Sequence, residues 1–175
     1  MQRAFEGTTP SIADSAFVSE MASLIGDVTV AENASVWPFT CLRGDYGPIS
    51  VGADSNVQDF TMLHEATIGS GVTIGHNVVV DRATVGDDVL VGISSTILPG
   101  ATVGDDCIVA AGTLLREEQE VPSGHMAYGA PAEIRPLSED HREQIRWYCE
   151  EYLALAERYR NDGAVRGDER EGNQG

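Results

Sequence analysis

Hydrophobic residues recur along this chain at a spacing of six positions, sometimes five. Aliphatic residues, usually followed by Gly, Ala or a polar residue, open these units at Val51, Val57, Leu63, Ile68, Ile74, Val80, Val85, Val91, Ile97, Val103, Val109 and Leu115. Upstream, Ile25, Val30, Val36 and Leu42 fit the same grid. An α-helix requires a period of 3.6 and a β-meander a period of 2 with hairpin turns. The pattern therefore predicts a three-sided β-solenoid, with one six-residue unit on each side.

Three such units make one coil of the predicted solenoid. A single coil cannot bury its own apolar residues, but stacked coils bury a continuous column and pair their backbones about 4.8 Å apart. We expect one domain, with the solenoid and its capping turns at 1–136, a helix at 137–160 and a disordered, polar tail at 161–175. Ser138 is the expected N-cap of that helix. Its apolar stripe would pack on the solenoid flank or on a neighbouring subunit, and comprises Ile145, Tyr148, Cys149, Tyr152, Leu155, Ala156 and Tyr159.

The chain is strongly acidic. It carries 28 acidic and 11 basic residues, for a formal net charge of −17, and it contains no lysine. Such a surface repels nucleic acids and anionic membranes, so neither is an expected partner. It also indicates a halophilic protein, because concentrated salt screens the repulsion between carboxylates. Three widely spaced cysteines, and the lack of a signal peptide or membrane-length apolar segment, predict a cytoplasmic location.

The repeat register places three polar residues in one column. His64 follows Leu63, Asp81 follows Val80, and Arg43 follows Leu42, so all three occupy the second position of a third-side unit. Residues in equivalent positions of successive coils stack about 5 Å apart. Arg43, His64 and Asp81 should therefore form a ladder along one edge.

His76 occupies a different side of the coil. It precedes Asp81 by five residues, a separation of up to about 16 Å along an extended chain. A metal–ligand bond is about 2 Å long, so His76 is not expected to share a metal with His64 and Asp81 of its own chain. A neighbouring subunit could supply it, and a closed ring of three subunits would place one such site at each interface.

Several motifs together resemble the gamma-class carbonic anhydrases. They are Val36-Trp37-Pro38, Leu42-Arg43-Gly44-Asp45, Asn56-Val57-Gln58-Asp59, Leu63-His64, Ile74-Gly75-His76 and Gly129-Ala130-Pro131-Ala132. The resemblance implies a left-handed β-helix in a homotrimer that hydrates CO₂ to bicarbonate by a metal-bound hydroxide at the subunit interfaces. By the same resemblance, His64, His76 and the position of Asp81 hold the metal, and Gln58, Arg43 and Asp45 belong to the active site. Asp59 matches a further family aspartate, with a structural role expected at the subunit interface.

The sequence departs from the family pattern at Asp81, where the family has a third histidine. A set of two histidines and one carboxylate binds Zn²⁺ and also suits Fe²⁺, Co²⁺ or Mn²⁺. Because a carboxylate adds negative charge, water on such a metal should be less acidic than with three neutral imidazoles. The loop after His64 is also short, and Glu65 is a weak substitute for the acidic proton shuttle of some relatives.

Other interpretations stay open at this point. His64 could be a surface histidine, and Asp81 could pair with Arg82 or Arg43 at a site that has lost its metal. Arg43 and Asp45 could form an ion pair across a subunit interface without any role in catalysis. The same solenoid serves acetyl-CoA-dependent acyltransferases, although no basic cluster for CoA phosphates is visible. A non-catalytic trimeric scaffold is the third alternative.

Overall fold

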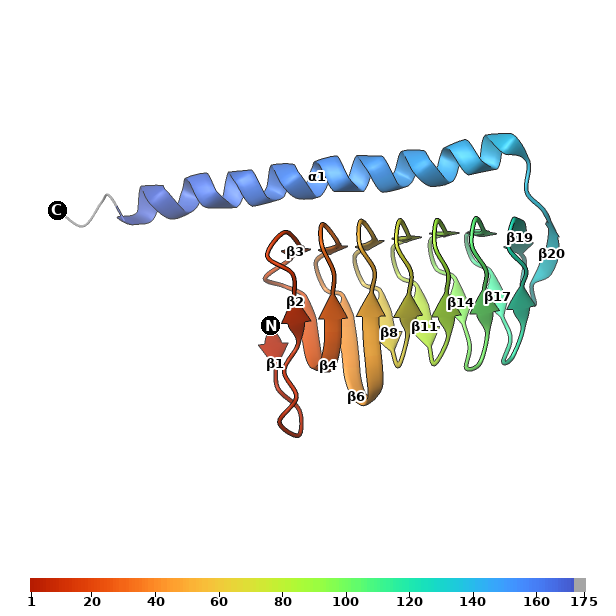
Figure 1. The fold of residues 1–175 in the computed structure, drawn as a ribbon, viewed down its shortest axis with the longest axis horizontal. Coiled ribbons are helices and arrows are strands. Elements are labelled where there is room, and N and C mark those ends of the chain that lie inside the picture. Colours follow the sequence, from red (N-terminus) through yellow and green to blue (C-terminus); the bar gives the residue numbers. More distant parts are fainter. Residues whose placement is uncertain (172–175) are drawn as a thin grey trace.

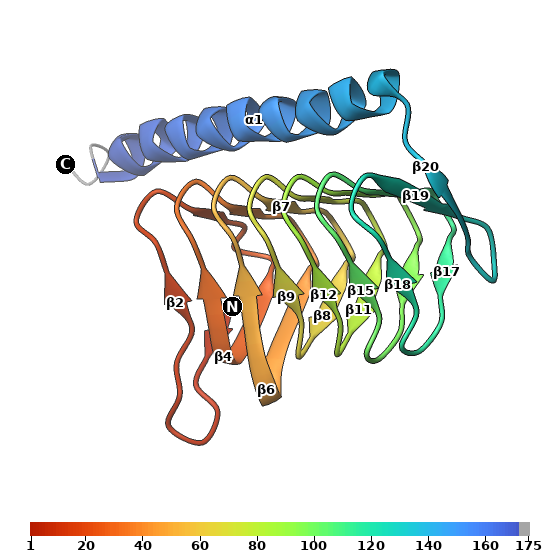
Figure 2. The ribbon, with the colours of Figure 1, turned by 45° about the vertical axis from the view of Figure 1, so that its right-hand side comes forward.

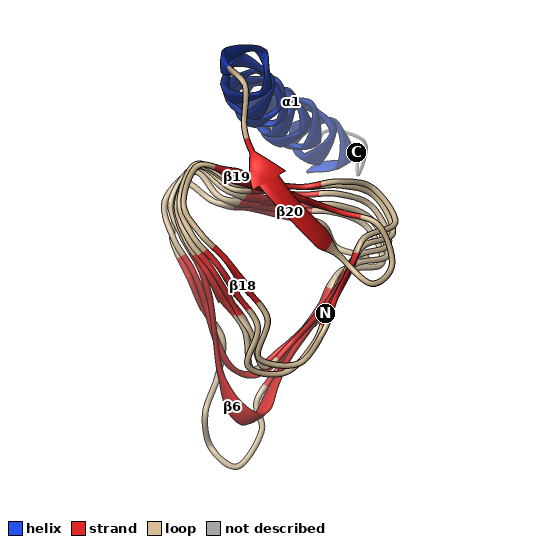
Figure 3. Cartoon of the chain, turned by 90° about the vertical axis from the view of Figure 1, so that its right-hand side faces the viewer, coloured by secondary structure: helices blue, strands red, loops and turns tan. Residues whose placement is uncertain are grey.

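The computed structural model describes residues 1–171, and within them the predicted β-solenoid is confirmed (Figure 1). Short strands stack in parallel into about seven left-handed coils, which are triangular when viewed along the axis (Figure 3). A single long helix, α1 (Glu139–Glu171), runs back along one face of the stack (Figures 1 and 2). No helix within residues 1–171 is long and apolar enough to cross a membrane.

The three faces of the solenoid are built from stacked strands. The first face comprises β2 (Ser11–Ile12), the ends of β4 (Ser23–Val30) and β6 (Cys41–Val51), and β9 (Thr67–Ile68), β12 (Thr84–Val85), β15 (Thr102–Val103) and β18 (Glu120–Val121). The second comprises β3 (Phe17–Val18), β5 (Ser35–Val36), β7 (Asn56–Val57), β10 (Thr73–Ile74), β13 (Leu90–Val91), β16 (Ile108–Val109), β19 (His125–Tyr128) and β20 (Glu133–Pro136). The third comprises β1 (Gln2–Arg3), the starts of β4 and β6, and β8 (Met62–His64), β11 (Val79–Asp81), β14 (Thr96–Ile97) and β17 (Leu114–Leu115).

The aliphatic residues that open the six-residue units form the core, with one exception. Leu42, Leu63 and Val80 are fully buried, as are their counterparts on the other two faces. The exception is Ile25, because Leu24 pairs with Leu42 and occupies the core position in its place. Leu24, Val30, Val36 and Leu42 follow one another at six-residue steps, so a strict six-residue period places Leu24, and not Ile25, in the core.

An extended corner in β6 interrupts the regular coil after Arg43. Strand β6 continues through this corner and pairs with β4 on both sides of the bend, and Tyr46 at its tip is 82% exposed. Gly44 is required there, because a β-carbon on it would clash with the backbone carbonyl of Asp27. The extended corner places Asp45 next to the third face, where the candidate site lies.

Helix α1 begins as predicted and covers the second face. The Ser138 hydroxyl lies 2.8 Å from Nδ1 of His141, and the Ser138 carbonyl accepts the His141 N–H. The helix contacts β3, β5, β7 and β10, so its expected packing on the solenoid flank is confirmed. Its bounds extend beyond the predicted end at residue 160 and into the predicted tail, whose last residues, 172–175, lie outside the described part.

Two clusters attach this helix to the solenoid. Near its start, buried Ile145 packs with residues of the second face, namely Leu90, Ile108 and Met126. Farther along, Tyr152 and Tyr159 stack edge-on against Trp37, with ring centroids 5.4 Å and 5.2 Å away. The predicted apolar stripe is therefore the face that touches the solenoid, although Tyr159 is 54% exposed.

Candidate metal-binding edge

The predicted polar ladder is present on the third face. Strand β8 pairs with β6 and with β11, so that His64 lies opposite Arg43 on one side and opposite Asp81 on the other. This register follows from the buried Leu63 and its counterparts, which hold each following residue at the same height and on the same edge. The repeat alone thus predicted which side chains would be neighbours.

Carboxylates surround the imidazole of His64, whose side chain is only 13% exposed. Nδ1 lies 2.9 Å from Oδ1 of Asp81, and Nε2 lies 3.3 Å from Oδ1 of Asp45. Glu65 is farther away, with Oε1 at 3.9 Å from Nε2. The Tyr46 ring stands perpendicular to the imidazole, with centroids 6.1 Å apart. Tyr46 was not predicted from the sequence, since nothing in the insert from Arg43 to Ser50 indicated that it would approach His64.

Arg43 holds Asp45 in place. Its Nη1 lies 2.5 Å from Oδ2 of Asp45, which leaves Oδ1 to face His64. Burial raises the pKa of Asp45, but hydrogen bonds from Arg43 and the backbone, together with the Arg43 charge, outweigh burial and lower that pKa below its ordinary value. Asp45 is therefore a carboxylate anion. Arg43 contacts Asp45 and not Asp81, while Arg82 lies 3.7 Å from Asp81.

His76 lies apart from this group, as the repeat predicted. It follows β10 on the second face and is 42% exposed, and its Nδ1 lies 3.1 Å from Oδ2 of Asp59. Gln58 is 4% exposed and donates its amide N–H to Asn56, which in turn donates to Thr73. The structure therefore brings Arg43, Asp45, His64 and Asp81 together, and places His76, Asp59 and Gln58 around the corner.

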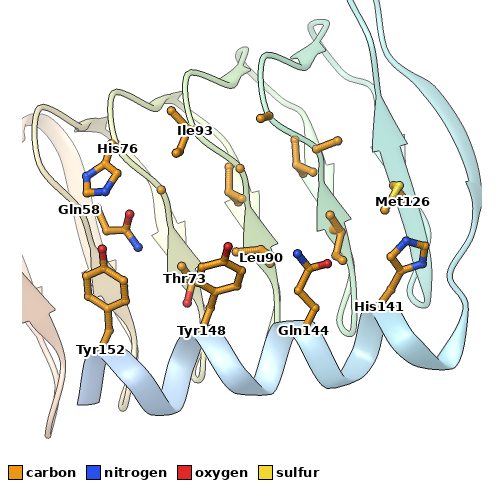
Figure 4. A pocket seen from close by; sticks show the side chains of 17 residues that line it. Gln58, Thr73, His76, Leu90, Ile93, Met126, His141, Gln144, Tyr148 and Tyr152 are labelled. Carbon is orange, nitrogen blue, oxygen red and sulfur yellow. The ribbon is translucent and has the colours of Figure 1, made fainter. Parts of the chain in front are cut away.

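A groove separates the second face from helix α1. It has a volume of about 360 Å³, and His76 and Gln58 lie at one end of it, beside Tyr152 (Figure 4). The floor is mainly aliphatic, while Tyr148 and Tyr152 approach from the helix. Sequence analysis did not predict this groove, because it exists only where the helix lies across the stacked strands.

Comparison with known proteins agrees with this architecture. A family model described as "Bacterial transferase hexapeptide (six repeats)" matches residues 82–117. A solved structure described as a hexapeptide transferase family protein from Anaplasma phagocytophilum superposes with a TM-score of 0.88 at 36% identity, covering 90% of this chain and 97% of that one. Fold and repeat thus define a hexapeptide-repeat protein of the left-handed β-helix class.

Curated relatives narrow this class. Gamma carbonic anhydrase 2, mitochondrial, of Arabidopsis thaliana is 36% identical over 161 residues, which cover 85% of this chain but only 58% of the plant protein. Carbonic anhydrase of Geobacillus kaustophilus (strain HTA426) is 35% identical over 162 residues, covering 89% of each chain. The chain belongs to the gamma-class carbonic anhydrase family. The predicted resemblance is confirmed at the level of the family.

The side chains around His64 are suited to form part of a metal site. Within residues 1–171 of one chain, no group of three or more His, Cys, Asp or Glu side chains is arranged to hold a metal ion. However, His64 Nε2 and Asp45 Oδ1 are buried, face each other at 3.3 Å and have no hydrogen-bond partner. A cation would satisfy both atoms, and imidazole and carboxylate are ligands that Zn²⁺ accepts. The residues fit a divalent metal if another subunit completes the site.

Proposed function

We propose that this chain is a carbonic-anhydrase-like metalloenzyme that reversibly hydrates CO₂ to bicarbonate at the interfaces of a homotrimer. The buried, unpartnered Nε2 of His64 among carboxylates, in a chain of this family, is the observation that carries the proposal. His64 of one subunit and His76 of the next would bind the metal, with Asp81 beside His64 in the same set of residues. Zn²⁺ is the expected ion, and Fe²⁺ or Co²⁺ also suits such a set.

The remaining polar residues have distinct roles in this proposal. When bound, the metal would supply the Lewis acidity that lowers the pKa of water toward neutrality. Arg43 holds Asp45 so that its free oxygen faces His64 and can accept a hydrogen bond from water. Gln58 would orient the substrate. Glu65, whose carboxylate lies 3.9 Å from His64 and whose side chain is 28% exposed, could pass a proton outward.

Metal content and subunit mass test this proposal directly. We expect purified protein to form trimers that hold close to one metal ion per chain and that hydrate CO₂ in stopped-flow assays. His64→Asn and His76→Asn should each lose metal and activity while remaining folded. His125→Asn, which changes a histidine outside this corner, is the matched control and should retain both.

A folded, metal-free trimer that still lacks activity after incubation with Zn²⁺, Fe²⁺ or Co²⁺ would refute the enzyme proposal. In that case the scaffold alternative would take its place, with Asp81 marking a site that has lost its metal. We also propose a cytoplasmic location, which the three free cysteines support.

An acyltransferase is the second candidate, and the apolar groove beneath α1 is the observation in its favour. The description of the Anaplasma relative as a transferase points the same way. Against it, the groove is lined by no Arg or Lys that could bind CoA phosphates. Calorimetric titration with acetyl-CoA separates the two candidates, since binding in the micromolar range would favour the transferase.

A further inference from the structure

Both histidines of the proposed site share one arrangement. Each presents Nδ1 to a carboxylate, with His64 at 2.9 Å from Asp81 and His76 at 3.1 Å from Asp59. The carboxylate comes from the following coil for His64 and from the preceding coil for His76, since Asp81 lies one coil beyond His64 and Asp59 one coil before His76. The same contact between Nδ1 and a carboxylate is therefore made twice, from opposite directions along the solenoid axis.

This contact determines where the neutral imidazole of His64 carries its proton. If Nδ1 is protonated, it donates to Asp81 at an ordinary hydrogen-bond distance. If Nε2 is protonated instead, a lone pair on Nδ1 faces a carboxylate oxygen at 2.9 Å, and two acceptors repel each other there. With Nδ1 protonated, the two facing acceptors are Nε2 and Oδ1 of Asp45, which lie farther apart at 3.3 Å and are not arranged to form a hydrogen bond. The shorter, well-formed contact with Asp81 therefore favours the tautomer that is protonated at Nδ1. This tautomer leaves the lone pair of the buried Nε2 directed toward Asp45, on the opposite edge of the ring from Asp81.

The length of the Asp81 side chain accounts for its position. Asp81 lies one coil from His64, and strands in successive coils are about 4.8 Å apart. A short aspartate at that spacing reaches the near nitrogen, Nδ1, and Arg82 contacts the same oxygen at 3.7 Å. The Asp81 carboxylate is thus held by His64 Nδ1 and Arg82. It lies on the side of the imidazole ring away from the unpartnered pair of atoms, His64 Nε2 and Asp45 Oδ1.

We propose that Asp81 is a positioning residue that orients His64 through Nδ1, as Asp59 orients His76, so that both histidines present Nε2 to the metal and Asp81 is not itself a ligand. This inference rests on the proposed function, because it assumes that the two histidines bind a metal. A histidine ligand commonly donates its second ring N–H to a carboxylate, which fixes the ring and makes it a better donor. The third protein ligand expected at position 81 would then be replaced by water or by Asp45.

Nitrogen NMR of the metal-free protein tests the hydrogen bond itself. At a pH where imidazole is neutral, we expect His64 in the wild type to be protonated at Nδ1. In Asp81→Ala the Nδ1–H signal should give way to a mixture of tautomers, whereas Asp81→Asn, which keeps an acceptor oxygen, should remain close to the wild type. Arg116→Ala is the control, because this exposed residue takes the equivalent register position two coils away from Asp81. A wild-type His64 protonated at Nε2 would overturn the proposal.

Zinc affinity, measured by chelator competition, tests the role of Asp81 toward the metal. Loss of an orienting carboxylate typically weakens metal affinity about 10- to 100-fold. We expect that loss in Asp81→Ala and in Asp59→Ala, and affinity within a few-fold of the wild type in Asp81→Asn. If Asp81→Asn and Asp81→Ala both abolish binding that the wild type shows, Asp81 is a ligand and the inference is wrong while the proposed function stands.

The proposed enzyme can also be refuted while the positioning role of Asp81 is retained. If wild-type protein binds no metal, the proposed enzyme is refuted, but the NMR experiment still decides the orientation of His64. Loss of the Nδ1–H tautomer in Asp81→Ala alone would then support the positioning role, and an unchanged tautomer would overturn it. Thermal unfolding of each variant ensures that the comparison is made between folded proteins.

Discussion

A single carboxylate, Asp88, illustrates how coil stacking brings like charges together. Partial burial, followed by the negative charges of Asp106, Asp87 and Asp105, raises its pKa above 3.8. The neighbours are one coil away or adjacent in sequence, because two successive coils each place an acidic pair, Asp87-Asp88 and Asp105-Asp106, at the same corner. The ionised form of Asp88 is therefore less stable in the folded protein than in the unfolded chain.

The first prediction concerns this residue. Asp88→Asn should stabilise the protein at pH 7, by about 0.5 kcal/mol or less because the group is largely exposed and solvent screens its neighbours. Asn also tolerates the positive φ of 52° at this position. Urea unfolding of the two proteins in low salt provides the measurement.

The sign of the pH dependence follows from the raised pKa. Below pH 3.8, Asp88 is protonated in both states and the variant gains nothing. As the pH rises through the raised folded-state pKa, the wild type loses stability relative to the variant, and the difference is complete above that pKa. An advantage for Asp88→Asn that grows toward acid pH would contradict the assignment.

At the scale of elements, helix α1 is attached by contacts with the second face. Ile145 is 3% exposed and packs against Leu90, Ile108 and Met126, whereas the opposite side of the helix faces solvent. The groove runs alongside this cluster, with Leu90, Ile108 and Met126 in its lining, and reaches Tyr152, which contacts Trp37. The helix therefore both covers the sheet and forms one wall of the groove.

The second prediction follows from this packing. Ile145→Ala should lower the free energy of unfolding by about 2–5 kcal/mol, the usual cost of such a truncation in a packed core. Glu151→Ala, on the exposed side of the same helix, should change it by no more than about 0.5 kcal/mol. Chemical denaturation measures both. Equal effects in the two variants would show that α1 does not depend on this contact for stability.

At the scale of the whole molecule, net charge opposes the compact state. The chain carries −17 formal charges and has only Arg among its strong bases. Self-repulsion of this kind weakens as ions screen it, because the screening length falls from about 10 Å at 0.1 M salt to about 3 Å at 1 M. The proposal of a halophilic protein rests on this balance.

The third prediction tests that proposal. The unfolding temperature should rise by several degrees between 0.1 M and 2 M potassium chloride, and most steeply at low salt, where screening changes fastest. Sodium chloride should act similarly, because the effect depends on ionic strength. Sucrose, which stabilises without screening, is the control. A flat response to both chlorides would count against halophilic adaptation.

Much of the fold and of the ladder could be predicted because both depend on one local repeat. Once Leu42, Leu63 and Val80 point into the core, Arg43, His64 and Asp81 must follow them on the same edge. The prediction was wrong at Ile25, which lies five residues before Val30, because Leu24 lies six residues before Val30 and takes the core position. Both five- and six-residue steps occur along the chain, and the pairing of Leu24 with Leu42 decides between them.

The sequence by itself determined the solenoid, its corner spacing, the ladder and the family, since periodic burial converts sequence distance directly into spatial position. Only the tertiary structure decided which partners those side chains contact. Asp45 reaches His64 through the extended corner of β6, Arg43 pairs with Asp45 and not with Asp81, and the groove forms where α1 crosses the second face. These contacts join segments whose relative placement depends on loop geometry and side-chain length, and neither is encoded in the six-residue period.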